Sequence, residues 1–362
     1  MTSNTAPLVS VLTPVYNGED YLVDCIESVL RQTYQNFEYI IINNCSKDRT
    51  LAIAQEYAKR DPRIRVHDNE KFVGVIDNHN IAFNQMSPDA QYCKVVSADD
   101  YLFPDCITKM VEMGEANPSV GFIGAYQLSG EIIKWQGFRY PTTVFPGREL
   151  GRRFFLSEQA FLGGEPVYGF GTPTSLMYRA SMVRDSKAFY PNDSPHSDTS
   201  AIFRYLRTWD FGFIYQVLSF ERTHSETQTS RSKQMNRYSS ATLNDLAQYG
   251  SFFLDKEELD ERIDAALKHY HRFLAASYFA RVKDEAFWQY HASRLQELGF
   301  PLKSHQLIAA GVSAAVSEAL NPFRSLTSRV VKRVFPKSAK VAAVAKPASG
   351  TQNGAQRAVA PR

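Results

Sequence analysis

The chain has 362 residues, of which 44% are hydrophobic, including 24 Phe and 19 Tyr. This length allows one large α/β domain with a smaller appendage, and the apolar content excludes a wholly disordered chain. The formal net charge of +3 is unevenly distributed. Nine bases and no acids follow Glu318, so residues 1–318 hold 32 bases against 38 acids, a net charge of −6. An acidic body argues against nucleic acid as a partner.

Cysteine spacing and hydropathy indicate a cytoplasmic protein. The cysteines form no C-x-x-C pair and lie within apolar or mixed runs, at Cys25, Cys45, Cys93 and Cys106. That pattern predicts reduced thiols rather than a disulfide or zinc framework. Met1–Leu8 lacks the basic start and apolar stretch of a secretory signal, and no uncharged apolar run is long enough to span a bilayer.

Strand and helix patterns alternate through the first hundred residues. β-Branched and aromatic runs predict strands over Val9–Pro14, Tyr39–Ile42, Ile64–His67 and Tyr92–Ser97. Apolar residues at helical spacing predict helices between them, over Gly18–Gln32, Arg49–Lys59 and Val75–Met86. This alternation predicts parallel strands joined by right-handed crossovers, and therefore an α/β fold with a mostly parallel sheet.

The later elements are predicted from weaker patterns. They are a strand over Val120–Gln127, a helix over Arg148–Leu156, a loop entering a short strand over Gly163–Tyr178, an amphipathic helix over His196–Trp209, and two or three helices over 233–298. Residues 336–362 show no periodicity and are predicted to be disordered. The predicted division is therefore an α/β domain over 1–230, a helical appendage over 231–300, a basic amphipathic segment over 301–335 and a disordered tail over 336–362.

Three polar pairs stand at the ends of predicted strands: Tyr16-Asn17, Asn43-Asn44 and Asp99-Asp100. Open parallel sheets bind ligands outside the carboxyl ends of their strands, so these pairs predict a site. Two adjacent carboxylates repel one another, and Mg²⁺ or Mn²⁺ relieves that repulsion while leaving positions open for substrate phosphates. The alternative for the acidic pair is a solvated turn that caps the helix starting near Pro104.

The motifs at these strand ends occur in a recognisable order. Pro14-Val15-Tyr16-Asn17, then Asn43 to Thr50, then Ser97-Ala98-Asp99-Asp100 resemble the family 2 glycosyltransferases of the GT-A fold. In that family the strands are followed by P-x-Y-N, D-D-x-S-x-D-x-T and an acidic metal-binding motif. Gln32–Glu38 also resembles the family's Q-T-[YF]-x-x-[FW]-E segment, and the resemblance covers residues 8–225. It implies a GT-A type nucleotide-sugar-binding domain.

The resemblance implies how the donor is bound. Pro14, Tyr16 and Asn17 would line the pocket for the nucleotide base and ribose. Asn44 falls where the family usually has the Asp that contacts the base, and Asn78 lies on the helix that closes over the donor. Turn and cap roles are the alternative for the asparagines, and they are equally favoured for Asn43.

The resemblance also implies a metal seat for Mn²⁺ or Mg²⁺. Asp100 falls on the family's metal-ligating Asp, and Asp99 on the neighbour that faces ribose or sugar. Phe220–His224 resembles the family's Y-R-x-H segment, in which Arg222 would neutralise leaving-group charge and His224 would ligate metal or contact diphosphate. Ser97 replaces the first acid of the usual D-A-D-D motif, which predicts a weaker hold on the metal.

Asp198 is the predicted catalytic base. It stands in His196-Ser197-Asp198, at the start of a predicted helix, where the family usually has an acidic residue followed by Asp. A helix N-terminus favours an ionised carboxylate, which is what removal of a proton from an acceptor hydroxyl requires. The alternative is that Asp198 simply caps its helix. Gly171–Ser175 resembles the family's acceptor-facing loop.

The basic segment after the helices has its own predicted partner. In His305–Phe335, Leu326, Val330 and Val334 share one helical face, and most of the bases lie on the other. Such a helix suits peripheral contact with an anionic membrane surface, at the inner face of the membrane. A solvated tail, or one that packs against the appendage, is the alternative.

These features together predict a metal-dependent, inverting, hexosyltransferase-type glycosyltransferase. It would move a sugar from a nucleotide-diphosphate sugar donor to a hydroxyl of a glycan or lipid-linked glycan acceptor, in the biosynthesis of a cell-surface polysaccharide. A sugar-nucleotide pyrophosphorylase would need a Gly-rich basic phosphate loop, and Pro14–Glu19 has one Gly and no base. A catalytically silent GT-A-fold protein that binds glycans or acts as a scaffold is the second alternative, because Asn44, Ser97 and Ser197 depart from the motifs.

Overall fold

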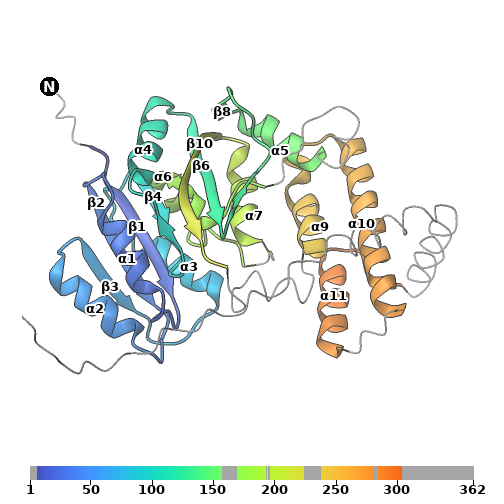
Figure 1. Cartoon of the computed structure of the whole chain (residues 1–362). Coiled ribbons are helices and arrows are strands. Elements are labelled where there is room, and N and C mark those ends of the chain that lie inside the picture. Colours follow the sequence, from blue (N-terminus) through green and yellow to red (C-terminus); the bar gives the residue numbers. More distant parts are fainter. Residues whose placement is uncertain are drawn as a thin grey trace, which may run out of the picture.

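A mixed sheet forms the centre of the molecule (Figure 1). The computed structural model describes residues 6–156, 169–192, 194, 196–223, 238–279 and 284–303. Within them the 10-stranded sheet has the order β3-β2-β1-β4-β9-β6-β10-β5, with β7 paired to β6 and β8 paired to β10. The chain is therefore an α/β protein, as the sequence predicts.

The first part of the sheet is parallel. Its strands are β1 (Val9–Val15), β2 (Phe37–Asn43), β3 (Ile64–Asp68) and β4 (Tyr92–Val95). The crossovers are α1 (Leu22–Leu30), α2 (Thr50–Arg60) and α3 (Val75–Asn84). Six of the seven residues of β1 are buried, which explains its nearly continuous apolar sequence, because helices cover both faces of a parallel sheet.

The second part of the sheet changes direction. β9 (Leu176–Arg179) lies antiparallel between β4 and β6 (Val120–Ser129), and β10 (Asp210–Glu221) then runs parallel to β6. Three short strands pair antiparallel with these, namely β5 (Tyr101–Leu102), β7 (Ile132–Lys134) and β8 (Val144–Phe145). The predicted parallel order thus holds as far as β4. The reversal at β9 brings the turn before it to the carboxyl end of β4.

Alternating side chains of the strands form two cores. On one face, Val9 and Val11 of β1 and Ile41 of β2 pack with α1, α2 and α4 (Cys106–Ala116). On the other face, Leu12 and Ile40 pack in a cluster with α3 and with three later helices, α5 (Gly147–Leu156), α6 (Ala180–Arg184) and α7 (Ser197–Leu206). Because successive side chains of a strand point to opposite faces of the sheet, each strand contributes residues to both cores.

Within the described residues, three α-helices follow the sheet body, and the sequence predicts two or three helices over 233–298. They are α9 (Tyr238–Tyr249), α10 (Lys256–Phe279) and α11 (Glu285–Glu297) (Figure 1). Tyr249 and Phe253 belong to the same buried cluster as Phe203 of α7. A Cβ on Gly151 of α5 would lie 2.5 Å from the Phe253 ring, so only glycine leaves room for that contact. The helical appendage therefore shares a core with the sheet body.

Several predictions fall outside the described residues. These are the domain boundary near residue 230, all but the first three residues of the segment 301–335, the tail 336–362 and His224. The division into domains accordingly stays a prediction. In the part of the chain that the structure describes, no helix is both long and apolar enough to cross a membrane. All four cysteines are free.

Candidate active site

The acidic pair lies beyond the carboxyl end of β4, and Asp100 is almost fully buried. Only 5% of Asp100 is exposed. Its Oδ2 accepts a hydrogen bond from the Thr174 hydroxyl at 2.7 Å, and its Oδ1 accepts one from the backbone N–H of Arg222 at 3.0 Å. Helix α4 begins only at Cys106. The alternative in which the pair caps this helix is therefore wrong.

Thr174 reaches Asp100 from a short 3₁₀ turn, η2 (Pro173–Ser175), directly before β9. Its hydroxyl also accepts from the backbone N–H of Ser97 at 3.0 Å. The fully buried ammonium of Lys94 donates to the carbonyl oxygens of Thr174 and Leu176, the latter at 2.9 Å, and so holds this turn against β4. The contact between Thr174 and Asp100 was not predicted, because no local pattern shows that β9 pairs with β4.

The electrostatics of the acidic pair favour a cation. Burial raises the pKa of Asp100 to about 7, and the Asp99 carboxylate adds to the rise, while the hydrogen bonds from Thr174 and Arg222 oppose it. A divalent ion would relieve this repulsion. Among the described residues no group of three or more His, Cys, Asp or Glu side chains is placed to hold a metal. Mg²⁺ and Mn²⁺ sites often use one or two carboxylates plus substrate phosphates, so Asp99 and Asp100 fit such an ion by their chemistry.

Arg222 connects the end of β10 to the acidic pair and to α1. Its Nε donates to the carbonyl oxygen of Asp99 at 3.0 Å, and its Nη2 donates to Asp24 Oδ2 at 3.0 Å. The guanidinium also lies over the Tyr21 ring, 4.9 Å from its centroid. The sequence analysis placed Arg222 and the acidic pair in one site, and the structure brings them into contact.

Two strand-end loops meet at Asn17. Its φ of 49° lies in the left-handed region, which Asn tolerates better than most residues. The Asn17 side-chain oxygen accepts from the Lys47 backbone N–H at 2.9 Å, and the Asn17 N–H donates to Ser46 Oγ at 2.9 Å. Asn17 therefore holds the loop after β1 to the loop after β2.

An exposed aromatic pair stands beside Asn17. Tyr16 is 44% exposed and Phe72 is 60% exposed, and their ring centroids lie 4.9 Å apart in an edge-to-face arrangement. Pro14 lies within β1, where it pairs with Ile42 of β2. The predicted base pocket residues Pro14, Tyr16 and Asn17 thus lie along one strand and the turn that follows it.

Asn44 is 2% exposed and holds the chain at Val73. Its Nδ2 donates to the Val73 carbonyl at 2.9 Å, and its Oδ1 accepts from the Val73 N–H at 3.0 Å. Asn69 donates from Nδ2 to Asn44 Oδ1 at 3.1 Å and to Asn78 Oδ1 at 2.9 Å. These contacts tie the end of β2 to α3. A direct contact of Asn44 or Asn78 with the donor stays a prediction.

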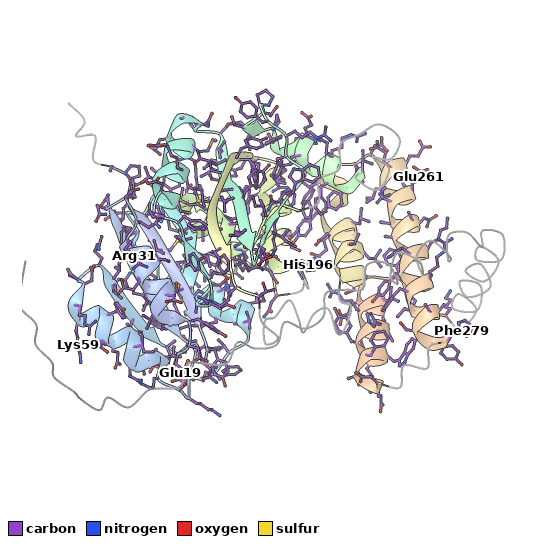
Figure 2. All side chains as sticks on the ribbon, in the orientation of Figure 1. Glu19, Arg31, Lys59, His196, Glu261 and Phe279 are labelled. Carbon is purple, nitrogen blue, oxygen red and sulfur yellow. The ribbon has the colours of Figure 1, made fainter. Side chains whose placement is uncertain are left out.

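Asp198 belongs to a second group, on α7. The Asp198 Oδ1 accepts from the Thr199 N–H at 2.8 Å, so the carboxylate does bind the start of its helix. Burial lowers the pKa of His79, on α3, and of His196, and the Asp198 charge opposes both shifts. The charge of the Asp198 carboxylate thus affects the pKa of His79 on α3, the helix that also carries Asn78. His196 is labelled in Figure 2, between the sheet body and the C-terminal helices in that view.

Comparison with known proteins places this site in a family. Residues 10–185 match the model of "Glycosyl transferase family 2". An uncharacterised glycosyltransferase of Haemophilus influenzae is 30% identical over 195 residues, which cover 53% of this chain and 58% of that protein. TuaG of Bacillus subtilis, whose provisional name places it in teichuronic acid biosynthesis, is 37% identical over 123 residues, or 34% of this chain and 48% of that protein. The chain thus matches only about half the length of these two relatives.

Solved structures show the same fold at low identity. TarS 1–349 of S. aureus in complex with UDP-GlcNAc has a TM-score of 0.57 at 16% identity, and the match covers 80% of each chain. The complex of TarS 1–349 with UDP has a TM-score of 0.56 at 15% identity, and covers 80% of this chain and 79% of that one. The fold is therefore of the GT-A type. Through residues 10–185, the chain belongs to glycosyl transferase family 2.

Proposed function

We propose that the chain is a metal-dependent, inverting, hexosyltransferase-type glycosyltransferase that uses a nucleotide-diphosphate sugar. The observation that carries the proposal is the contact of Asp100, Thr174 and Arg222 at the carboxyl end of β4. The buried carboxylate of Asp100, the half-buried carboxylate of Asp99 and the Arg222 guanidinium together suit a diphosphate held with a divalent cation. The TarS structures in complex with UDP and with UDP-GlcNAc support a donor of this class.

The proposed reaction is a single displacement. An acceptor hydroxyl gives its proton to the Asp198 carboxylate, and its oxygen forms a bond to the anomeric carbon of the donor sugar. The bond from that carbon to the diphosphate oxygen breaks on the opposite face, so the nucleoside diphosphate leaves and the anomeric configuration inverts. Mg²⁺ or Mn²⁺ held by Asp100, with Asp99 and His224 beside it, would supply positive charge to the departing diphosphate. Arg222 adds charge at the same edge.

Donor turnover tests the proposal. Purified chain with Mn²⁺ and a panel of nucleotide sugars should release a nucleoside diphosphate, and NMR of the product should show an inverted anomeric centre. Asp100→Asn should abolish metal-dependent donor binding in calorimetry, whereas Asp105→Asn, at an exposed acid five residues later, should not. If no donor binds and Asp100→Asn changes neither metal nor nucleotide binding, the chain is a silent member of the fold.

The base has a separate test. Asp198→Asn should keep donor binding and lose transfer by about 10² to 10⁴-fold, the usual contribution of a general base. Asp185→Asn, at an exposed acid after α6, is the matched control. Unchanged transfer by the Asp198 variant would remove this residue from the mechanism.

We also propose that the acceptor is a glycan or lipid-linked glycan of a cell-surface polysaccharide, and that the segment 301–335 contacts an anionic membrane surface from the cytoplasmic side. The name of TuaG supports the polysaccharide, and the nine bases after Glu318 support the membrane contact. A chain that ends at Pro322 should no longer sediment with vesicles of anionic lipid, while the full chain should. Equal sedimentation of the two would contradict the membrane contact.

A further inference from the structure

A buried acid of the helical appendage contacts the helix that carries Asp198. Asp245, on α9, is 3% exposed, and Ser200, on α7, is fully buried. The Ser200 hydroxyl donates to Asp245 Oδ1 at 2.7 Å, and Asn244 donates from Nδ2 to the same oxygen at 3.3 Å. Arg294 of α11 donates to Asn244 Oδ1, so the contact draws on two helices of the appendage.

The same hydroxyl network fixes the entry of the chain into α7. The hydroxyl oxygens of Ser200 and Ser194 lie 2.7 Å apart. Ser194 Oγ accepts from the His196 N–H at 3.1 Å, and the Ser197 hydroxyl donates to the Ser194 carbonyl at 3.0 Å. The Ser200 hydroxyl thus lies between the Asp245 carboxylate of α9 and the Ser194 hydroxyl, and it joins α9 to the segment that precedes α7.

Asp198 lies on the other side of the same helical turn. Ser200 contacts α9 through Asp245, and residues two apart on a helix point in nearly opposite directions, so the side chain of Asp198 points away from that of Ser200. The charge of Asp198 acts on His79 of α3 and on Tyr190, and it also helps to raise the pKa of Asp245. The hydrogen bonds of Ser194, Ser197 and Ser200 thus hold the first turn of α7 in place, and the same turn carries the proposed base, Asp198.

A packing role alone does not account for a carboxylate at this position. Ile202 and Phe203 of α7 already pack with Leu246 and Tyr249 in one apolar cluster. Burial raises the pKa of Asp245 to about 7, which shows that the site disfavours the charge. An apolar residue of similar size would dock α9 at lower electrostatic cost, but it would remove the hydrogen bond that joins Ser200 of α7 to α9.

We infer that Asp245 is a positioning residue for the catalytic base. Through Ser200 it fixes how far the first turn of α7 is rotated about the helix axis and where the turn lies along that axis. Asp245 thereby orients the Asp198 carboxylate toward the acceptor. The helical appendage is then part of the catalytic unit rather than an independent module. This inference rests on the proposed function, since it assumes that Asp198 is the base.

The experiment compares four variants of the full chain. Asp245→Leu and Ser200→Ala should lower kcat by about ten- to a hundredfold, the loss expected from a small misplacement of a catalytic group, with the KM for donor unchanged. Asp245→Asn keeps an acceptor oxygen for Ser200 and should recover most of kcat. Ser240→Ala is the matched control, because Ser240 is also a buried residue of α9 and its hydroxyl pairs with Tyr290 of α11.

A second readout does not depend on turnover. Amide hydrogen exchange of residues 197–206 should rise in Asp245→Leu and Ser200→Ala, and should stay at the wild-type level in Asp245→Asn and Ser240→Ala. Unchanged exchange and kcat in Asp245→Leu would overturn the inference, and so would an equal loss of kcat in Ser240→Ala. If exchange responds as expected but the wild type transfers no sugar from any donor, the contact with α7 stands while the catalytic role and the proposed function both fail.

Discussion

At the scale of single residues, the asparagines that replace acids of the family are the most informative positions. The Asn44 side chain donates to the Val73 carbonyl oxygen from Nδ2 and accepts from the Val73 N–H at Oδ1. A carboxylate at this position keeps the bond from the Val73 N–H but faces the Val73 carbonyl with no proton to donate. The amide therefore has a structural reason in this chain, independent of which base the donor carries.

Restoring the family residue should therefore harm this protein. We expect Asn44→Asp to loosen residues 69–75, because a buried carboxylate would lie against the Val73 carbonyl oxygen with no proton to donate to it. Hydrogen exchange across 69–75 should increase, and the free energy of unfolding should fall by about 1–3 kcal/mol. Asn36→Asp, at an exposed asparagine before β2, is the control. A variant as protected as the wild type would contradict this role for Asn44.

The raised pKa of Asp245 predicts that the stability of the folded chain depends on pH. Its pKa is raised from 3.8 to about 7 by burial in the folded chain, so the native state binds the proton more tightly than the unfolded state. The stability that this group contributes is fully present below pH 4 and is lost as the pH rises towards 7, by about 1.4 kcal/mol for each unit of pKa difference. Urea denaturation at pH 5 and pH 8 should show wild type losing stability relative to Asp245→Asn. Parallel losses in the two proteins would refute this prediction.

At the scale of elements, the turn before β9 decides the geometry of the acidic pair. Gly171 has a φ of +127°, a conformation that side chains rarely adopt, and a Cβ there would lie 2.3 Å from Ser175 Oγ. The turn that follows places the Thr174 hydroxyl on Asp100 and on the Ser97 N–H. A short glycine-dependent turn therefore completes the site that β4 begins.

Gly171→Ala should disturb this turn by strain and by contact. Gly130→Ala is the matched control, because Gly130 also has a positive φ of +59° but its nearest atom to a new Cβ is 3.8 Å away. The control should lose about 1–2 kcal/mol of stability from the left-handed backbone alone. Gly171→Ala should lose more, and should also weaken nucleotide binding in calorimetry. Equal losses in urea denaturation, with nucleotide binding intact, would show that Thr174 does not depend on this turn.

At the scale of the whole molecule, the sheet body and the C-terminal helices share one core. Phe253 packs against Phe155 of α5 and Phe203 of α7, with ring centroids 5.9 Å and 6.1 Å away. The appendage also has a small cluster of its own around Tyr270 and Leu274. Because the larger cluster crosses from one part to the other, we expect the two parts to unfold together.

A core truncation tests this cooperativity. Phe253→Ala should lower the stability of the sheet body and of the helices alike, by about 3–5 kcal/mol for a buried Phe. Trp135 and Trp209 lie in the sheet body, and Trp288 lies on α11. Trp288→Phe therefore leaves reporters in the sheet body alone, and a chain with both Trp135 and Trp209 replaced by Phe leaves a reporter in the helices alone. The unfolding transitions of the sheet body and of the helices should have the same midpoint, and Phe253→Ala should lower both midpoints by the same amount. Tyr278→Ala, at a 63% exposed ring of α10, should leave both in place.

Most of the predicted strands and helices are present within a few residues, because both are local consequences of the sequence. β1 and β2 are nearly continuous apolar runs, which predicts strands buried on both faces. α1 repeats apolar residues at helical spacing, which predicts a helix buried on one face. The two-residue strand β5 and the antiparallel course of β9 carry no such signal. Their partners are distant in the chain, so only the complete sheet places them.

The sequence by itself determined the fold class, and it placed Asp99 and Asp100 at the end of a strand, where open parallel sheets bind ligands. The family resemblance of Phe220–His224 added Arg222 to that group. Only the tertiary structure decided that Thr174 and Lys94 complete that site, and that Asp245 supports the helix of Asp198. Thr174 lies 74 residues from Asp100 along the chain, and Asp245 lies 45 residues from Ser200. Contacts at such separations depend on how β9 and α9 pack, and no local pattern of side chains encodes that.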